Sequence, residues 1–141
     1  MCNFAVELLG SIRTDGKVRF YKLLVNGVAQ IDMFYDELRN DKKLEKEFNE
    51  ILTCMDYVAE TNAQLPSNKV NSIKDGDKEI AIEFKKKNLR VYCIKKEPDF
   101  FVILGGYKNN QKKDVEKIKR LLKGDKYFID KLQQSINNTE L

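Results

Sequence analysis

The chain has 141 residues, a net charge of +4 and 34% charged residues, with three cysteines and no histidine. This length predicts one domain that can bury a core, and no apolar run approaches the ~20 residues that cross a bilayer. The lack of histidine excludes Ser–His and Cys–His catalysis and most zinc sites. Cys2, Cys54 and Cys93 are far apart and odd in number, which predicts a reducing, cytoplasmic compartment rather than a disulfide framework. We expect no signal peptide, no membrane contact, no metal ion and no other cofactor.

The two halves of the chain differ in charge. Residues 1–84 carry 11 Lys/Arg against 15 Asp/Glu, a balance of −4, whereas residues 85–131 carry 15 against 6, a balance of +9. Such asymmetry is typical of a protein in which one part faces a polyanion. The simpler explanation is that the lysines are ordinary solvated surface residues.

The first half of the chain predicts one strand and two helices. Residues 1–16 are hard to interpret, and residues 4–9 fit either an extra strand or a short helix. Residues 17–25 alternate in part and predict the first strand. Residues 30–39 predict a short helix, and residues 41–62 predict a long one with seven apolar side chains at spacings of three and four. Burying these seven at ~1.5–3 kcal/mol each would anchor the long helix on a sheet.

The middle of the chain predicts a loop and then three strands. Residues 63–77 contain Pro, Gly, Asn and Ser and predict a loop with one small ordered turn around residues 70–73. Residues 80–84 and 89–94 each alternate as half-buried strands do, and residues 100–104 are apolar throughout, as in a central strand covered on both faces. A lysine-rich turn and a Pro-containing turn separate these three segments.

Two glycines, Gly105 and Gly106, follow the last of these strands, and two helices should complete the chain. Residues 110–124 have apolar side chains at helical spacing and end at a glycine, and residues 126–141 predict a further helix.

The strand at residues 89–94 has one feature that bears on function. Successive strand side chains point to opposite faces of a sheet. If Leu89, Val91 and Cys93 pack inward, Arg90 and Tyr92 share the other face. We expect that face to hold cationic side chains against an RNA backbone.

The second half of the chain resembles the RelE/ParE toxin superfamily of type II toxin–antitoxin systems, and most closely its HigB-like branch. The resemblance rests on a Leu-Arg-aromatic strand and on a Gly-aromatic-Lys-x-x-Gln-Lys step before a helix. The matching positions are Leu89, Arg90, Val91, Gly106, Tyr107, Lys108, Gln111 and Lys112. The similarity is clear over about 45 residues and extends more weakly over residues 17–123. It implies a single toxin domain at residues 1–141, with residues 124–141 as a C-terminal helical extension.

The resemblance also implies a fold. We expect an α+β domain in which two N-terminal helices pack on a small, curved, antiparallel β-sheet, with one or more C-terminal helices. In this family the first strand lies beside the later strands, and we expect residues 17–25 to do the same.

The implied function is that of a toxin that cuts messenger RNA in the ribosomal A site without a metal ion and is held inactive by a cognate antitoxin. We expect the protein to occur as a dimer or as a toxin–antitoxin oligomer. Two alternatives stay open. ParE-like members of the superfamily inhibit DNA gyrase without catalysis, and a third interpretation is an inactive member that binds RNA or protein. The absence of histidine and of a late Arg-plus-Tyr pair separates this chain from RelE itself.

Metal-free RNA cleavage needs a base for the ribose 2′-OH, cations for the phosphate and an acid for the leaving 5′-oxygen. Lysine can transfer protons if neighbouring cations lower its pKa, and arginine grips phosphate with its planar fork. The predicted catalytic residues are Arg90, Lys85, Lys87, Lys108 and Lys112. The predicted substrate-binding residues are Lys86, Tyr92, Tyr107 and Gln111, with the tyrosines stacking on bases.

Each of these residues also has an ordinary structural explanation. Lysines in turns are usually solvated, and Tyr107 fits a core position equally well. Arg90 could pair with Glu79 or Glu83 across the sheet.

Overall fold

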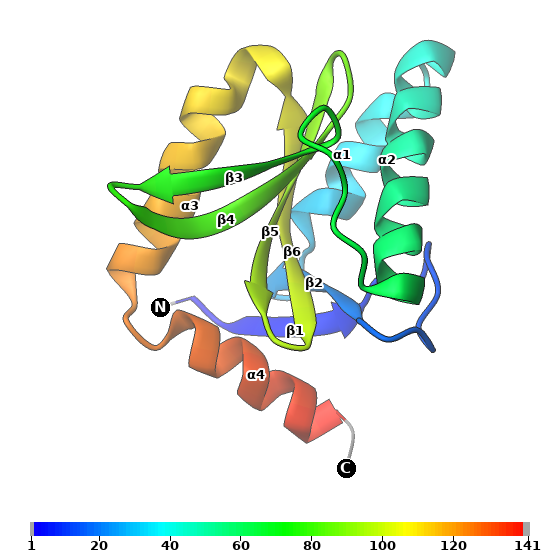
Figure 1. Ribbon diagram of the computed structural model, residues 1–141. Coiled ribbons are helices and arrows are strands. Elements are labelled where there is room, and N and C mark those ends of the chain that lie inside the picture. The colour runs from blue at the N-terminus through cyan, green and yellow to red at the C-terminus, as the bar shows by residue number, and fades with distance from the viewer. Residues whose placement is uncertain (1, 140–141) are drawn as a thin grey trace.

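A six-stranded mixed β-sheet forms the centre of the protein, in the strand order β1-β2-β6-β5-β4-β3. The computed structural model describes residues 2–139. Helices α1 and α2 cover one face of the sheet and α3 covers the other, while α4 lies along β1 (Figure 1). The strands are β1 (Phe4–Leu8), β2 (Phe20–Val25), β3 (Val70–Asp75), β4 (Lys78–Lys85), β5 (Leu89–Lys96) and β6 (Asp99–Tyr107). The helices are α1 (Gln30–Leu38), α2 (Lys42–Thr61), α3 (Gln111–Gly124) and α4 (Phe128–Thr139).

The predicted fold class is wrong in its sheet and in its element order. The sheet is not antiparallel, because β2 runs parallel to β6. The helical pair is not N-terminal either, because β1 and β2 precede α1, and four of the six strands follow α2. The class α+β is correct. Periodicity reports which side chains share a face but not the direction in which a strand runs, so the parallel pair left no signal in the sequence.

Several individual elements are confirmed. The predicted helices and the three consecutive strands in the second half occur within a few residues of their predicted limits, and β2 lies beside β6 as expected. Residues 4–8 form a strand rather than a helix. The predicted loop at residues 63–77 is wrong in part, because Val70–Asp75 form β3, an edge strand that pairs with β4. The predicted C-terminal helix is α4; its last two predicted residues lie outside the described part of the chain.

Helix α2 shows how local sequence sets an element. The Asp41 carboxylate accepts hydrogen bonds from the backbone N–H groups of Lys43 and Leu44 and so caps the amino end. Asn62 adopts a left-handed conformation, with φ of 55°, and its N–H donates to the Val58 carbonyl at the carboxyl end. The helix buries an apolar face against the sheet. Its buried apolar residues are Phe48, Ile51, Met55, Val58 and Ala59.

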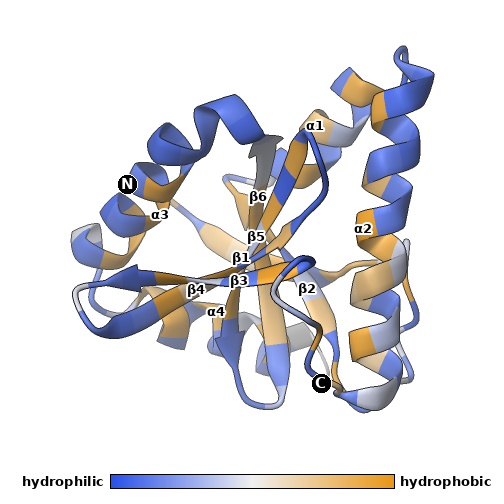
Figure 2. Cartoon of the chain, turned by 45° about the horizontal axis from the view of Figure 1, so that its top comes forward, coloured by the Kyte–Doolittle hydropathy of each residue, from blue (hydrophilic) through white to orange (hydrophobic). Residues whose placement is uncertain are grey.

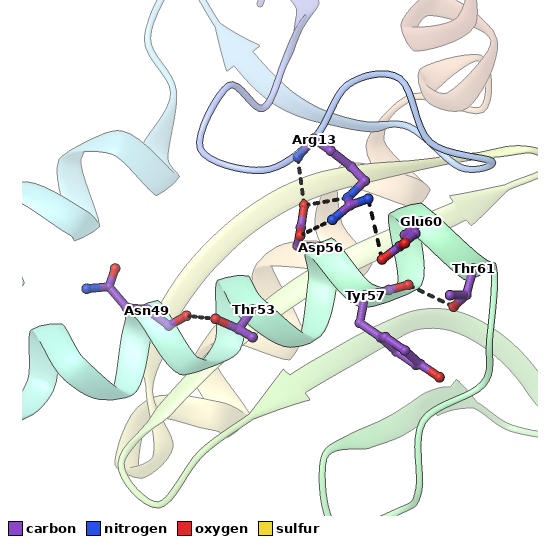
Figure 3. A network of polar contacts seen from close by, with 7 residues as sticks. All are labelled: Arg13, Asn49, Thr53, Asp56, Tyr57, Glu60 and Thr61. Atoms are coloured by element: carbon purple, nitrogen blue, oxygen red, sulfur yellow. Dashed lines mark hydrogen bonds and ion pairs between the residues drawn. The ribbon is translucent and has the colours of Figure 1, made fainter.

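The segment before β2 is tied to the outer side of α2. The Asp56 carboxylate accepts from the backbone N–H of Arg13 at 2.8 Å and from its Nε and Nη2 atoms at 3.1 and 3.0 Å. A second carboxylate, that of Glu60, lies 3.4 Å from Arg13 Nη1 (Figure 3). Gly16 lies so close to α2 that a Cβ there would be 2.2 Å from the carbonyl oxygen of Ala59.

Two apolar cores lie on the two faces of the sheet, which explains why β6 is buried along its length. The inner strands are mostly hydrophobic, whereas α3 is mostly hydrophilic with a few apolar residues (Figure 2). Helix α4 packs on β1 through apolar contacts, and the Ser135 hydroxyl accepts a hydrogen bond from the Val6 N–H at 3.0 Å. No helix among the described residues combines the length and the hydropathy that crossing a membrane requires.

Candidate nucleic-acid interface

Two segments that are distant in sequence meet at one end of the sheet. The turn between β4 and β5 lies beside the connection between β6 and α3, because Arg90 pairs with Gly106 in the sheet register. Beyond this pair, the backbone N–H of Lys108 donates to the carbonyl of Asn88 at 2.8 Å. This packing brings together four predicted site lysines, which we call the basic end: Lys85, Lys87, Lys108 and Lys112.

The four lysines of the basic end have no carboxylate partner among residues 2–139. Lys85 is half-buried, and the other three are exposed. Lys86 differs from them, because its Nζ lies 2.8 Å from Glu50 Oε2 on α2. This hydrogen bond and ion pair raise the pKa of Lys86 and lower that of Glu50, so both stay charged. The basic end therefore offers four cations to a ligand, whereas Lys86 is already engaged.

The lysine turn is held in place by α2. The Glu47 carboxylate accepts from the backbone N–H of Asn88 at 2.8 Å and from its Nδ2 at 2.7 Å. Glu47 is only 8% exposed, so these two bonds form in a largely dry environment. Such a clamp reduces the freedom of the turn that carries the lysines. Glu47 was not among the predicted site residues.

Arg90 lies beneath the surface rather than on it. The residue is 7% exposed, and its Nη1 donates to the carbonyls of Lys86 and, at 2.8 Å, of Leu89. Its Nε lies 3.7 Å from Glu83 Oε1, so one of the two ion pairs that the sequence suggested across the sheet is present. The prediction that Arg90 and Tyr92 share the face opposite Leu89 is confirmed, but the expectation that this face is open to RNA is wrong, because α3 covers it.

Glu83 connects three elements under the start of α3. It is 1% exposed and accepts from Asn71 Nδ2 at 3.1 Å and from Gln111 Nε2 at 2.7 Å. The predicted substrate ligand Gln111 is therefore bonded to the protein. Sequence alternation placed Glu83 on the polar side of a half-buried strand, but β4 is covered on both faces, so a carboxylate became buried.

The two predicted base-stacking tyrosines lie on opposite faces of the sheet. Tyr92 is fully buried, and burial raises the pKa of its hydroxyl. Tyr107 packs edge-on against Phe34 of α1, with ring centroids 5.2 Å apart, and burial together with nearby Glu37 raises its pKa. Neither ring is presented to the basic end in this conformation.

The two glycines of β6 allow close packing on both faces. A Cβ at Gly105 would lie 2.6 Å from the Phe34 ring, and a Cβ at Gly106 would lie 2.0 Å from Asp114 Oδ2. Asp114 belongs to the first turn of α3 and is 6% exposed, and burial raises the pKa of its carboxyl. Gly106 therefore lets the start of α3 approach the sheet beside Arg90.

The amino end of α3 adds a further attraction for anions. No side chain caps it, but a 3₁₀ turn (Lys108–Asn110) leads directly into it, and the Gln111 N–H donates to the Lys108 carbonyl. A helix amino end carries a partial positive charge. Among the described residues, no group of three His, Cys, Asp or Glu side chains is arranged to hold a metal ion. The basic end can thus bind an anion through its ammonium groups, close to the positive end of the α3 dipole.

Comparison with known proteins gives no information on the family or function of this chain. No model of a protein family matches this chain, and no curated protein matches it significantly. The resemblance to the RelE/ParE superfamily therefore rests on the sequence motifs and stays a prediction.

Proposed function

We propose that this protein is a metal-independent endoribonuclease that cuts messenger RNA on the ribosome, as the toxin of a type II toxin–antitoxin pair. The convergence of the four lysines of the basic end, without carboxylate partners, carries this proposal. A group of cations that no protein carboxylate neutralises favours phosphate, and phosphate contacts dominate the affinity of nucleic-acid binding.

The lysines have different positions and hence different proposed roles. Lys85 lies opposite Arg90 in the register of β4 and β5, where the chain is partly sheltered from water, and we assign it proton transfer at the ribose 2′-OH. Lys108 lies in the 3₁₀ turn before α3 and Lys112 in the first turn of α3, and both hold the phosphate. Lys87 is exposed on the turn and binds an adjacent phosphate.

Arg90 acts through its neighbours in this proposal. Its guanidinium donates to two carbonyls at the ends of the lysine turn, so it is a positioning residue that fixes the turn. An Arg90→Lys variant keeps the positive charge but not the planar fork. It should lower the cleavage rate while leaving the salt dependence of RNA binding close to that of the wild type.

The motif resemblance supplies the biological part of the proposal. It points to messenger RNA in the ribosomal A site as substrate and to an antitoxin as partner. The cysteines Cys2, Cys54 and Cys93 are all free, which fits the reducing cytoplasm in which such a pair would act.

The test is cleavage of a defined message in a purified translation system, with primer extension to map the new 5′ ends. We expect the wild type to cut within translated codons and Lys85→Ala to be about 100-fold slower, as for loss of a general base. Lys108→Ala should weaken binding, and Lys108→Arg should restore part of it. Lys126→Ala is the matched control, since Lys126 is an exposed lysine that follows the carboxyl end of α3, whereas the basic end lies at the amino end of that helix.

Three results would overturn the proposal. Equal cleavage by wild type and the lysine variants would remove the basic end from the reaction. Growth arrest with intact messages and inhibited DNA supercoiling would identify a gyrase inhibitor. Neither cleavage nor arrest from protein with a wild-type circular dichroism spectrum would leave a binding module.

RNA binding offers an independent measurement. For single-stranded RNA, each phosphate contact contributes about 0.7 to the slope of log K against log salt concentration. Removing both Lys87 and Lys108 should therefore lower the slope by about 1.4 if both contact phosphate. An unchanged slope would contradict the phosphate-binding roles.

A further inference from the structure

Glu83 of β4 is the most deeply buried charged residue among residues 2–139, with 1% of its surface exposed. A carboxylate in such a place is unfavourable unless its oxygens are bonded, because burial removes the water that would solvate the charge. Its partners therefore show what keeps it there. They come from β3, β5 and α3, and two of these connections lead to the basic end.

The first connection leads through Arg90 to the lysine turn. The Nε atom of Arg90 lies 3.7 Å from Glu83 Oε1, and among residues 2–139 this buried nitrogen has no hydrogen-bond partner. The Nη1 atom of the same guanidinium donates to the carbonyls of Lys86 and Leu89. The Glu83 charge thus holds the guanidinium from one side, while the guanidinium holds the turn that carries two lysines of the basic end.

The second connection leads to the start of α3. The Oε2 atom of Glu83 accepts a hydrogen bond of 2.7 Å from Nε2 of Gln111, which is the first residue of α3. Lys112 follows Gln111 directly, and Lys108 lies in the 3₁₀ turn that leads into the helix. This bond therefore ties the segment that carries the other two lysines of the basic end to the sheet.

Both connections end on one carboxylate, whose two oxygens stay at a fixed distance from each other. The guanidinium and the amide that they engage are therefore held in a fixed relation. The backbone hydrogen bond from Lys108 to Asn88 joins the same two segments at 2.8 Å, but it constrains the turn before α3 rather than the helix itself. Because the carboxylate is shielded from water, its charge-assisted contacts are stronger than they would be at the surface.

We propose that Glu83 is a positioning residue for RNA cleavage, which holds the lysine turn and the start of α3 in the relative position that the reaction needs. This inference rests on the proposed function of the basic end. There Lys85 must reach the ribose while Lys108 and Lys112 hold the phosphate, so the placement of the two segments sets the rate. A misplacement of about 1 Å can slow a reaction by about 100-fold. Glu83 itself is too deeply buried to contact RNA and acts through the side chains bonded to it.

The test is single-turnover cleavage in the purified translation system, with the protein in excess over the programmed ribosomes. It gives the maximal rate and the protein concentration at half-maximal rate. Gln111→Ala removes the connection to α3, and Glu83→Gln keeps the shape of the side chain but removes the charge that faces Arg90. Each should lower the maximal rate by about 10- to 100-fold, because the lysines remain but are misplaced. The half-saturating concentration should change by less than about threefold, because the phosphate ligands are intact.

Asn71→Ala is the matched control. Asn71 Nδ2 donates to Glu83 Oε1 at 3.1 Å from β3, an edge strand that carries no lysine of the basic end. The variant removes one hydrogen bond from the same carboxylate but leaves both connections to the basic end. It should lower the midpoint of urea denaturation without lowering the maximal rate.

A paired exchange adds a readout that a purely structural role would not produce. Gln111→Glu places a second carboxylate against Glu83, and the repulsion should lower the maximal rate at least tenfold. Adding Glu83→Gln restores an amide opposite a carboxylate across the same gap and should recover at least threefold of that loss. Gln111 is only partly buried, so its variants keep the test valid if Glu83→Gln unfolds.

The outcomes separate this inference from the proposed function. Cleavage at the wild-type rate by Gln111→Ala and Glu83→Gln would overturn the role of Glu83 and leave the proposed function intact. An equal loss in Asn71→Ala, or rates that follow the urea midpoint in every variant, would show that Glu83 only stabilises the fold. Absence of cleavage by the wild type would refute the proposed function, and the role of Glu83 with it.

Discussion

Gly106→Ala tests how closely α3 is packed on the sheet. The added Cβ would lie 2.0 Å from Asp114 Oδ2, whereas real Cβ contacts stay beyond 3.0 Å, so the two groups must separate by about 1 Å. Asp114 is buried in the first turn of α3, next to the Gln111–Glu83 hydrogen bond of 2.7 Å. The separation therefore requires either a rotated, less favourable Asp114 side chain or a displaced first turn.

The expected loss is about 1–3 kcal/mol in the free energy of unfolding, which is typical of overpacking a well-packed site. Urea denaturation at neutral pH measures it, with circular dichroism as the signal. The decisive comparison is the same substitution in an Asp114→Ala background. There the Cβ has space, and Gly106→Ala should be close to neutral, since alanine also restricts the unfolded chain.

The double-mutant cycle gives the result that would refute this reasoning. A coupling energy of about 1–3 kcal/mol between positions 106 and 114 is expected. If Gly106→Ala costs as much without the Asp114 carboxylate as with it, the close approach of α3 to Gly106 is wrong.

Three further predictions concern other parts of the fold. Burial raises the pKa of Asp114 in the folded protein, so this group adds stability as the pH falls from 7 through its folded pKa. Asp114→Asn should lack that gain when the free energy of unfolding is measured between about pH 7 and pH 4, and a pH profile identical to that of the wild type would contradict the burial. Gly16→Ala should lower the free energy of unfolding by about 2–3 kcal/mol or more, because the new Cβ meets the Ala59 carbonyl oxygen of α2 at 2.2 Å and a backbone atom cannot rotate away. Urea denaturation measures this loss, and a neutral result would contradict the contact. Asp56→Asn should lower the free energy of unfolding by about 0.5–1 kcal/mol at low salt and by less at high salt, since the ion pair between Asp56 and Arg13 is partly exposed. A loss that does not depend on salt would show that the ion pair is not the cause.

The second half of the chain was predictable because its patterns are strong. Strands β4, β5 and β6 alternate or are continuously apolar, and α3 has clear apolar spacing with Gly124 at its end. The weak elements were harder. Strand β3 has the polar sequence VNSIKD, which suits an edge strand yet has no alternation that separates it from a loop.

The sequence singled out the lysines of the candidate site, but it did not predict which of the other site residues are buried. The sequence marked residues 85–90 and Lys108 separately as site candidates, and the fold brings these segments together. The burial of Arg90 and Tyr92 could not be read from the strand that carries them, because it depends on which helix covers that face. Glu83 was missed for the same reason, since alternation alone marks it as a polar outward residue.

The hydrogen bond from the Val6 N–H to the Ser135 hydroxyl bears on aggregation, because it lies at an edge of the sheet. Strand β1 is at the border of the sheet and pairs only with β2, so its outward N–H groups are a template on which a strand of another chain could assemble. Ser135 occupies one of these groups, and the body of α4 stands beside the strand. The C-terminal helix thus covers an edge on which another chain could pair, and its removal would expose that edge together with the part of the apolar core that Phe128, Leu132 and Ile136 complete.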